Sequence, residues 1–315
     1  MPLRFTLRQL EYFIAVADHG SIAAAAGQLN VSSPSISAAI TQLEEGFRLQ
    51  LFTRKRAHAL SLTRAGQQFL EQSRNVMRET RQLNALSADI TGKMQGPLHV
   101  GCLLTFAQIV LPQLRRKFAD ANPDVEFRQF ERTQTELIEG IQNATLDVAL
   151  TYDLSIPHDL EFASLVDLPP YALFAPSHPL AREASVSLKQ LAQHPMVLLD
   201  LPVSASYFTS LFQHARLKPL IGERTRDMAA MQSLVANGFG YGLANIRPTS
   251  ELAPDGKPLR HVPVSGAVRP MKLGLLLSDG AKSSLVVRRF VEHARAQLGS
   301  RAVPGLKMPR EGATP

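Results

Sequence analysis

The chain has 315 residues, with 34 Lys and Arg against 27 Asp and Glu, one Cys and no Trp. A length of this order predicts about two domains, and a hydrophobic fraction of 45% excludes a disordered or fibrous chain. One cysteine excludes a disulfide framework or a multi-cysteine metal site, and no apolar run approaches the ~18 residues of a membrane span. We therefore expect a cytoplasmic protein with no membrane segment.

The net charge of +7 favours a polyanion as a partner, and the charge is unevenly distributed. Residues 1–66 carry seven Lys and Arg against four Asp and Glu, so about a fifth of the chain holds +3 of the surplus. The only basic triplet of this segment is Arg54-Lys55-Arg56. Such a triplet alone is more often a solvated surface than a binding site, so its interpretation depends on the fold around it.

Three short helices and a hairpin are predicted in residues 1–65. The helices are predicted at 7–19, 22–29 and 33–47, and the strands at 51–53 and 59–62. Ser21 is a suitable N-cap for the second helix, and Pro34 suits the first turn of the third. Three helices followed by such a hairpin predict an all-α winged helix-turn-helix domain.

The third helix and the hairpin carry the residues that we expect at double-stranded DNA. In a helix-turn-helix the third helix lies in the major groove with residues at base edges, and a basic wing lies beside phosphates. The candidates for base contacts are Ser32, Ser33, Pro34, Ser35, Ser37, Ala38, Thr41 and Gln42, and those for phosphate contacts are Arg54, Lys55 and Arg56. Because the third helix has no Lys or Arg, we expect affinity mainly from the wing and specificity from the helix.

One long helix is predicted over residues 66–91. Four apolar residues recur every seven positions along it: Phe69, Val76, Leu83 and Ile90. This spacing is typical of a helix that pairs with a partner helix, and packing within its own chain is the alternative. The glycines and proline of residues 92–97 indicate a hinge between this helix and the rest of the chain.

Strand and helix patterns alternate from residue 98 onward. The predicted strands are 98–103, 125–130, 146–152, 171–174, 196–199, 241–244 and 271–277, and the predicted helices are 107–118, 135–143, 206–215, 227–237 and 283–297. Alternation of this kind predicts an α/β fold with a parallel sheet. Residues 303–315 are rich in Pro, Gly and charge and are expected to form a flexible tail.

A specific string of residues at fixed spacing runs through the N-terminal segment. Its members are Leu10, Phe13, Gly20-Ser21, Ala24-Ala25, Leu29, Ser32, Pro34, Ser37, Ile40, Leu43-Glu44, Leu51-Phe52, Arg54, Leu62-Thr63 and Gly66. In this string the chain resembles the LysR-type transcriptional regulators. Three positions depart from the family pattern: Ser33 stands where the family usually has Gln, and Arg48 and Ala144 stand where it usually has Gly.

The resemblance implies a regulator with an effector-binding domain at residues 98–302. This domain would consist of two periplasmic-binding-protein-like α/β subdomains, one of residues 98–167 and 268–302 and the other of residues 168–267. The long helix would pair two subunits into a homodimer on a two-fold DNA site, and the family also suggests tetramers. The expected partners are promoter DNA, a small-molecule effector, further copies of the chain and, for an activator, RNA polymerase. No metal or other cofactor is expected.

Ligands of open α/β sheets bind beyond the carboxyl ends of the strands. This rule places seven candidates around an effector cleft, Thr105, Phe106, Thr133, Thr151, Ser204, Asn245 and Arg247, and Arg226 is added as a further source of charge. Thr105 and Ser204 precede predicted helices, so their hydroxyls and the helix amides suit a carboxylate or a similar small anion. Arg226 or Arg247 would complete the charge. For each residue alone, capping or packing is the alternative.

Two further signals do not point to chemistry. Gly238, Gly240 and Gly242 resemble part of a nucleotide-binding loop, but Leu243 occupies its sixth position and the stretch follows a helix, so a helix-to-strand turn is predicted. Cys102 is predicted to be a small buried hydrophobe and not a redox sensor. With no catalytic constellation in the sequence, a ligand-responsive DNA-binding regulator is favoured. The alternative is a small-molecule-binding protein or an enzyme with a basic N-terminal domain.

Overall fold

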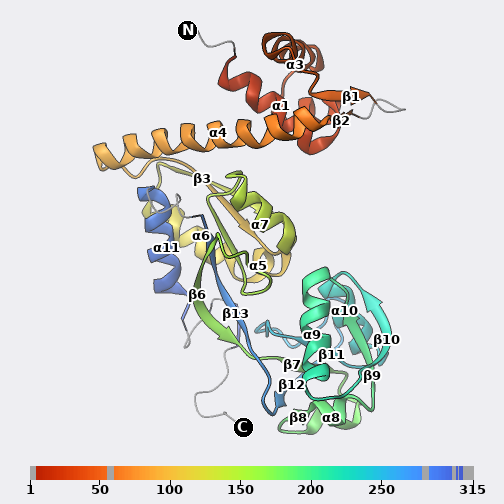
Figure 1. Cartoon of the computed structure of the whole chain (residues 1–315). Helices are drawn as coiled ribbons and strands as arrows, with labels where there is room; N and C mark the ends of the chain where they lie inside the picture. The colour runs from red at the N-terminus through yellow and green to blue at the C-terminus, as the bar shows by residue number, and fades with distance from the viewer. Residues whose placement is uncertain (1–4, 55–59, 279–283, 300–302, 304, 308–315) are drawn as a thin grey trace. The chain divides into compact units, whose positions relative to one another are not determined.

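The computed structural model in Figure 1 describes residues 5–54, 60–278, 284–299, 303 and 305–307. The chain forms two compact units, one of residues 1–93 and 142–145 and the other of residues 94–141 and 146–315. Apolar side chains of residues 10–77 form the core of the first unit, and a larger core occupies the second.

The N-terminal unit is a winged helix-turn-helix, as predicted. Its elements are α1 (Leu7–His19), α2 (Ile22–Leu29), α3 (Ser33–Phe47), β1 (Phe52–Arg54), β2 (Leu60–Leu62) and α4 (Arg64–Thr91). The two strands pair antiparallel. Ser21 caps α2 by accepting a hydrogen bond from the Ala24 N–H at 3.1 Å, and Ser32 caps α3 by accepting one from the Ser35 N–H at 3.3 Å.

An apolar core joins the short helices to the beginning of α4. Phe13 is fully buried, and its ring centroid lies 5.3 Å from that of Phe69 in α4. Phe69 also contacts Phe47 of α3, with a centroid distance of 4.8 Å. Phe69 therefore packs within its own unit, which corrects its placement in a seam between two subunits.

The other three residues of the heptad stripe on α4 are exposed. Val76, Leu83 and Ile90 have exposed fractions of 36%, 67% and 76%. Large apolar side chains that stay in water within the single chain gain stability only when a partner covers them. Of the stripe that the sequence assigns to a seam, Val76, Leu83 and Ile90 stay open to a partner, whereas Phe69 does not.

The second unit begins with an α/β subdomain whose sheet has five strands. Its elements are β3 (Gly96–Cys102), α5 (Leu104–Ile109), α6 (Leu111–Ala121), β4 (Val125–Glu131), α7 (Gln134–Gln142), β5 (Val148–Tyr152), β6 (Glu161–Leu168), β13 (Met271–Leu277) and α11 (Leu285–Gln297). The strand order is β4-β3-β5-β13-β6, in which β3 pairs parallel with β4 and β5 but β13 pairs antiparallel with β5 and β6. The sheet is therefore mixed, which corrects the expectation of parallel strands throughout: β13 returns from the second subdomain and runs opposite to β6 (Figure 1).

The second subdomain lies between β6 and β13 in the chain. Its elements are β7 (Tyr171–Phe174), the 3-10 helix η2 (Pro179–Arg182), β8 (Val186–Ser187), α8 (Leu188–Leu191), β9 (Pro195–Leu199), α9 (Pro202–His214), β10 (Leu220–Thr225), α10 (Met228–Ala236), β11 (Gly242–Ala244) and β12 (Arg260–Ser265). Four strands pair in the order β11-β7-β12-β8, and β9 pairs parallel with β10. A parallel bridge between Met196 and Tyr241 joins the two groups of strands. The chain passes between the subdomains twice, after β6 and after β12 (Figure 1).

Several elements differ from those predicted. The strands β6, β8, β10 and β12 were not predicted. The first three lie at the edges of their sheets, and β12 contains Pro263, a residue that usually argues against a strand. The helix predicted at 107–118 is two helices, α5 and α6, which meet at Val110. Pro112 in the first turn of α6 lacks the N–H group that a continuous helix would require.

The glycine-rich stretch forms the turn between α10 and β11, as predicted. Gly240 has a φ of +143°, and a Cβ placed on it would lie 2.2 Å from the carbonyl oxygen of Pro195. Both the backbone conformation and the close approach therefore require glycine at this position.

The described part of the C-terminal segment packs against the second unit. Val303 and Leu306 are only 3% and 8% exposed, and the Lys307 N–H donates to the Arg247 carbonyl at 2.9 Å. This finding corrects the expectation of a flexible tail from residue 303. The overall content of Pro, Gly and charge concealed two apolar residues that the fold buries.

Candidate functional site

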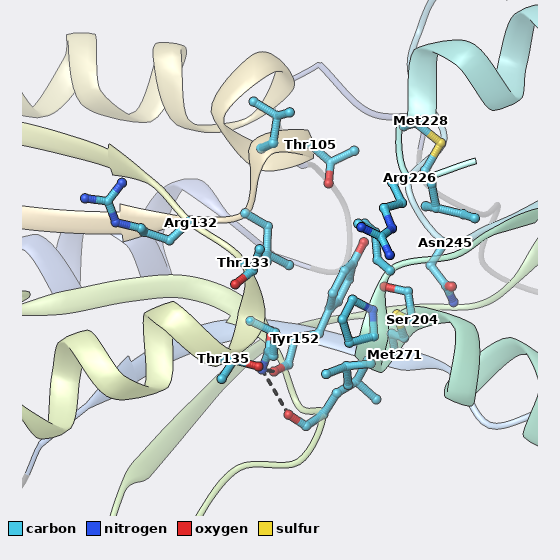
Figure 2. Close-up of a pocket in the computed structure, with 18 of the residues that line it drawn as sticks. Thr105, Arg132, Thr133, Thr135, Tyr152, Ser204, Arg226, Met228, Asn245 and Met271 are labelled. Atoms are coloured by element: carbon cyan, nitrogen blue, oxygen red, sulfur yellow. Dashed lines mark hydrogen bonds between the residues drawn. The ribbon is translucent and has the colours of Figure 1, made fainter. Parts of the chain in front are cut away.

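A cavity of about 330 Å³ lies between the two subdomains of the second unit (Figure 2). The loops after β3, β4, β9 and β10 line it, together with the end of β11 and residues of β5 and β13. The four loops follow the carboxyl ends of parallel strands, where the topological rule places ligands, whereas β13 runs antiparallel and contributes its first residue. Half of the lining residues are apolar, among them Leu154, Phe208, Met228 and Met271.

Five of the eight candidate effector residues line this cavity. They are Thr105, Thr133, Ser204, Arg226 and Asn245. Thr105 and Ser204 lie in the first turns of α5 and α9 and not before them, because these helices begin at Leu104 and Pro202. The cavity therefore gathers four of the residues that the strand-end rule selected, together with Arg226.

The other three candidates do not line the cavity. Phe106 is fully buried in the core of the second unit. Thr151 is also fully buried and donates its hydroxyl hydrogen to Gln134 Oε1. Arg247 forms an ion pair with Glu251, with a separation of 3.8 Å between Nη2 and Oε1. The rule identified the correct loops, but it does not indicate the direction of each side chain.

Gln134 is a lining residue that the sequence analysis missed. It is 8% exposed, and its Nε2 donates to the carbonyl oxygens of Leu154 at 2.9 Å and Tyr152 at 3.2 Å. Together with the bond from Thr151, these contacts give both atoms of the amide a partner. Gln134 thus fixes the wall of the cavity, and a polar residue at the start of a helix that follows a strand is the signal that could have identified it.

Thr133 lines the cavity, but its hydroxyl already has a structural role. Its N–H and its Oγ1 both donate to Glu136 Oε2 at 2.8 Å, which caps α7. The backbone hydrogen bond from Thr133, followed by its hydroxyl, lowers the pKa of Glu136. The Glu136 carboxylate is therefore occupied by the cap.

Asn245 is the most buried polar group among the candidates that line the cavity, with 6% of its surface exposed. Its Nδ2 donates to the Leu168 carbonyl at 2.7 Å and to the Tyr207 hydroxyl at 3.2 Å. Its Oδ1 is buried and has no partner among the described residues. A buried acceptor without a donor costs about 1–3 kcal/mol, so this atom favours a ligand that donates a hydrogen bond.

Arg226 supplies positive charge to the cavity. Figure 2 shows its side chain pointing into the space, whereas that of Arg132 points away. No carboxylate of the described residues pairs with Arg226, in contrast to Arg224, which contacts Asp200 at 3.2 Å. Ser204 lies near the uncapped N-terminus of α9, where the helix amides also favour an anion.

The candidate DNA-contacting residues lie on the exposed face of α3. Pro34, Ser35, Ser37, Ala38, Thr41 and Gln42 are exposed, Ser33 is half-buried, and Ser32 caps the helix. Arg54 is the last residue of β1, whereas Lys55 and Arg56 lie outside the described residues. Hydrogen bonds already hold several of these groups: Ser32 Oγ lies 2.7 Å from Ser35 Oγ, and Thr41 donates to the Ser37 carbonyl at 3.1 Å.

The structure gives no sign of other chemistry in the part of the chain it describes. Cys102 is fully buried, and this burial, followed by the charge of Glu131, raises the pKa of its thiol to about 12. The thiolate, which is the reactive form, is thus disfavoured. Over the described ranges, no cluster of three His, Cys, Asp or Glu side chains is arranged for a metal ion, and no helix is long and apolar enough to span a membrane.

Both units match known protein families. Residues 7–67 match the bacterial regulatory helix-turn-helix protein, lysR family, and residues 91–299 match the LysR substrate binding domain. The chain belongs to the LysR family of transcription regulators. It is therefore a DNA-binding regulator with a substrate-binding domain, and not an enzyme.

Individual LysR-family proteins match nearly the whole chain. An uncharacterised HTH-type regulator of Escherichia coli, YnfL, is 29% identical over 92% of this chain and 98% of its own length. The crystal structure of HinK from Pseudomonas aeruginosa has 34% identity and a TM-score of 0.63, over 94% of this chain and 99% of its own. The structure of full-length CbnR complexed with its target DNA has 27% identity and a TM-score of 0.55, over 93% of this chain and 99% of its own.

Proposed function

We propose that this LysR-family regulator senses a small carboxylate through the cavity between its subdomains and changes its binding to promoter DNA in response. The observation that carries the proposal is the Arg226 side chain, which points into a largely apolar cavity and has no carboxylate partner among the described residues. A guanidinium group in such surroundings binds a carboxylate through charge-assisted hydrogen bonds.

The other polar groups of the cavity refine the chemistry of the effector. The Ser204 hydroxyl and the first turn of α9 donate hydrogen bonds, so they suit the same anionic group. Asn245 Oδ1 accepts, so it suits a hydroxyl or amine hydrogen of the ligand. Phe208, Met228 and Met271 favour an apolar body between these polar ends. An effector with a carboxylate, an apolar body and a hydrogen-bond donor satisfies all three features.

DNA recognition is assigned to the exposed face of α3, with phosphate contacts from the basic triplet of the wing. The exposed stripe of Val76, Leu83 and Ile90 is assigned to pairing with α4 of a second copy. A homodimer presents two copies of α3 to a two-fold site, which fits a regulator that acts on promoter DNA in the cytoplasm. An activator of this kind would also contact RNA polymerase.

A thermal-shift screen of the full chain tests the ligand class. The panel consists of small aliphatic and aromatic carboxylates, each paired with its uncharged amide. A ligand at ~100 times its Kd stabilises the folded chain by about 2.7 kcal/mol, which we expect to raise the Tm by roughly 5–10 °C. A carboxylate should produce this shift in the wild type, whereas its amide should not, and Arg226→Gln should lose it. Equal shifts from acid and amide, or no shift from any carboxylate, would contradict the proposal.

A further inference from the structure

The first turn of α1 fixes the orientation of the Gln9 side chain. The Thr6 N–H donates to Gln9 Oε1 at 2.8 Å, and Thr6 Oγ1 accepts from the Gln9 N–H at 3.2 Å. This reciprocal pair is a capping box, with glutamine in the third position of the helix. Rotating the Gln9 amide by 180° would place Nε2 opposite the Thr6 N–H, so the cap determines which end of the amide carries the oxygen.

The fixed amide of Gln9 in turn fixes Gln42 on α3. Gln9 Nε2 donates to Gln42 Oε1 at 2.7 Å, a contact between residues 33 positions apart in the sequence. Because Gln9 can offer only its N–H groups to this contact, Gln42 must offer its oxygen. Gln42 Nε2 has no hydrogen-bond partner among the described residues, and the residue is exposed.

We propose that Gln9 makes Gln42 a hydrogen-bond donor toward the DNA bases, so that Gln42 prefers a guanine and rejects a cytosine at the position it contacts. In the major groove, guanine presents two acceptors, N7 and O6, whereas cytosine presents only the N4 amino group. A glutamine without this constraint would rotate its amide to suit either base. Gln9 therefore acts as a positioning residue for base selection, without needing to contact a base. The proposal rests on the assignment of the α3 face to DNA under the proposed function.

The substitution Gln9→Glu reverses the constraint while it conserves the shape of the side chain. A glutamate in this position still accepts from the Thr6 N–H, so the capping box and the stability of α1 are retained. Its carboxylate accepts hydrogen bonds but does not donate them, so Gln42 must turn its Nε2 toward Glu and present Oε1 to the DNA. The variant is therefore expected to shift the preference at that position from guanine toward cytosine.

Selection of bound duplexes from a pool of randomised DNA, with the purified full-length chain, measures this preference directly. In the wild type, guanine should be favoured over cytosine by roughly fivefold or more at the position that Gln42→Ala renders indifferent. Gln9→Glu should reduce or reverse that ratio. In the Gln42→Ala background, Gln9→Glu should have no effect on it, because the amide through which Gln9 acts is absent.

Controls separate base selection from added charge and from loss of DNA binding. Gln28→Glu adds the same charge at an exposed position of α2 and should lower affinity without changing the base ratio. An unchanged ratio in Gln9→Glu would overturn the proposal, and so would a Gln42→Ala variant with wild-type preferences at every position. After either of these outcomes, the proposed function as a regulator stands if the wild type still selects a specific sequence. A wild type that selects no sequence would contradict both this inference and the proposed function.

Discussion

Lys307 Nζ donates to Glu251 Oε1 at 2.7 Å, which ties the C-terminal segment to the loop between β11 and β12. Gly305 in the same segment lies against α5, since a Cβ placed on it would be 2.8 Å from the Ile109 carbonyl oxygen. Through Gly305 and Lys307 this segment thus contacts both subdomains that border the cavity. Asn245, which lines the cavity, is only two residues from Arg247, whose carbonyl accepts from the Lys307 N–H.

Burial predicts that Leu306 contributes more to the free energy of unfolding than the ion pair of Lys307. Leu306 is 8% exposed, so Leu306→Ala should lower the free energy of unfolding by about 2 kcal/mol or more. Lys307→Ala removes an ion pair whose two side chains are 42% and 38% exposed, and it should cost less than about 1 kcal/mol. Urea unfolding of the full chain measures both. A larger loss in Lys307→Ala than in Leu306→Ala would contradict this ranking.

At two positions where LysR-family proteins usually have glycine, this chain has a different residue, and both of these residues have a positive φ. Arg48, which ends α3, has a φ of 56°, and Ala144 has a φ of 52°. A residue with a Cβ in the left-handed region lowers the free energy of unfolding by about 1–2 kcal/mol. Glycine avoids this cost, but it also gives the unfolded chain more freedom, which cancels part of the gain. We expect Arg48→Gly and Ala144→Gly each to stabilise the protein by about 0.5–1 kcal/mol. Thermal unfolding of each variant provides the measurement, and Ala38→Gly, inside α3, is a control that should instead be destabilising.

The pH dependence of stability is predicted to include a contribution from His261 on β12. Burial, followed by the charge of Arg247, lowers the pKa of this histidine from 6.5 to about 4. Between these pH values the unfolded chain binds more protons than the folded one. Stability should therefore fall as the pH decreases through this window, by up to about 1.4 kcal/mol per pH unit from this group.

Urea unfolding at pH 7 and pH 5 tests this contribution. His261→Gln should show a smaller loss of stability between the two pH values than the wild type. The exposed His214 of α9 provides the control, because His214→Gln should retain the wild-type dependence. Identical pH dependence in His261→Gln and the wild type would contradict the prediction.

The exposed stripe on α4 predicts how the chain assembles. Val76→Asp combined with Leu83→Asp should produce monomers in analytical ultracentrifugation, since two charges in an apolar seam cannot be desolvated cheaply. Gln68→Asp with Gln72→Asp adds the same charge at exposed polar positions of α4 and should leave the assembly unchanged. If the first variant stays dimeric, the subunits associate through another surface.

The sequence predicts the N-terminal unit better than the second one. Ser21, Pro34 and the apolar stripes of the helices act locally, so they locate three helices and the hairpin closely. The short edge strands β8 and β10 bury a single residue between them, Val186, and the pairing of β6 with β13 depends on a distant part of the chain. Tertiary contacts also place Phe69 in the core of its own unit, which a seven-residue spacing alone does not reveal.

The cavity could be located from the sequence, but its detailed chemistry could not. Strand ends gave the correct loops, because chain topology fixes which ends meet. Whether a side chain enters the cavity depends on its hydrogen bonds and packing: Thr151 is held by Gln134, and Phe106 belongs to the core. The pairing of Gln9 with Gln42 was equally invisible, because it joins two helices that only the fold brings together.

Occupancy of the cavity is proposed to control DNA binding. This control is tested most directly by fluorescence-anisotropy titration of the full chain onto DNA from upstream of its own gene, at one fixed salt concentration. The titration is repeated with the carboxylate that gives the largest thermal shift, for the wild type and for Arg226→Gln. We predict that this carboxylate changes the Kd of the wild type by about fivefold or more and leaves that of Arg226→Gln unchanged. A carboxylate that binds the wild type but leaves its Kd for this DNA unchanged would contradict this proposal.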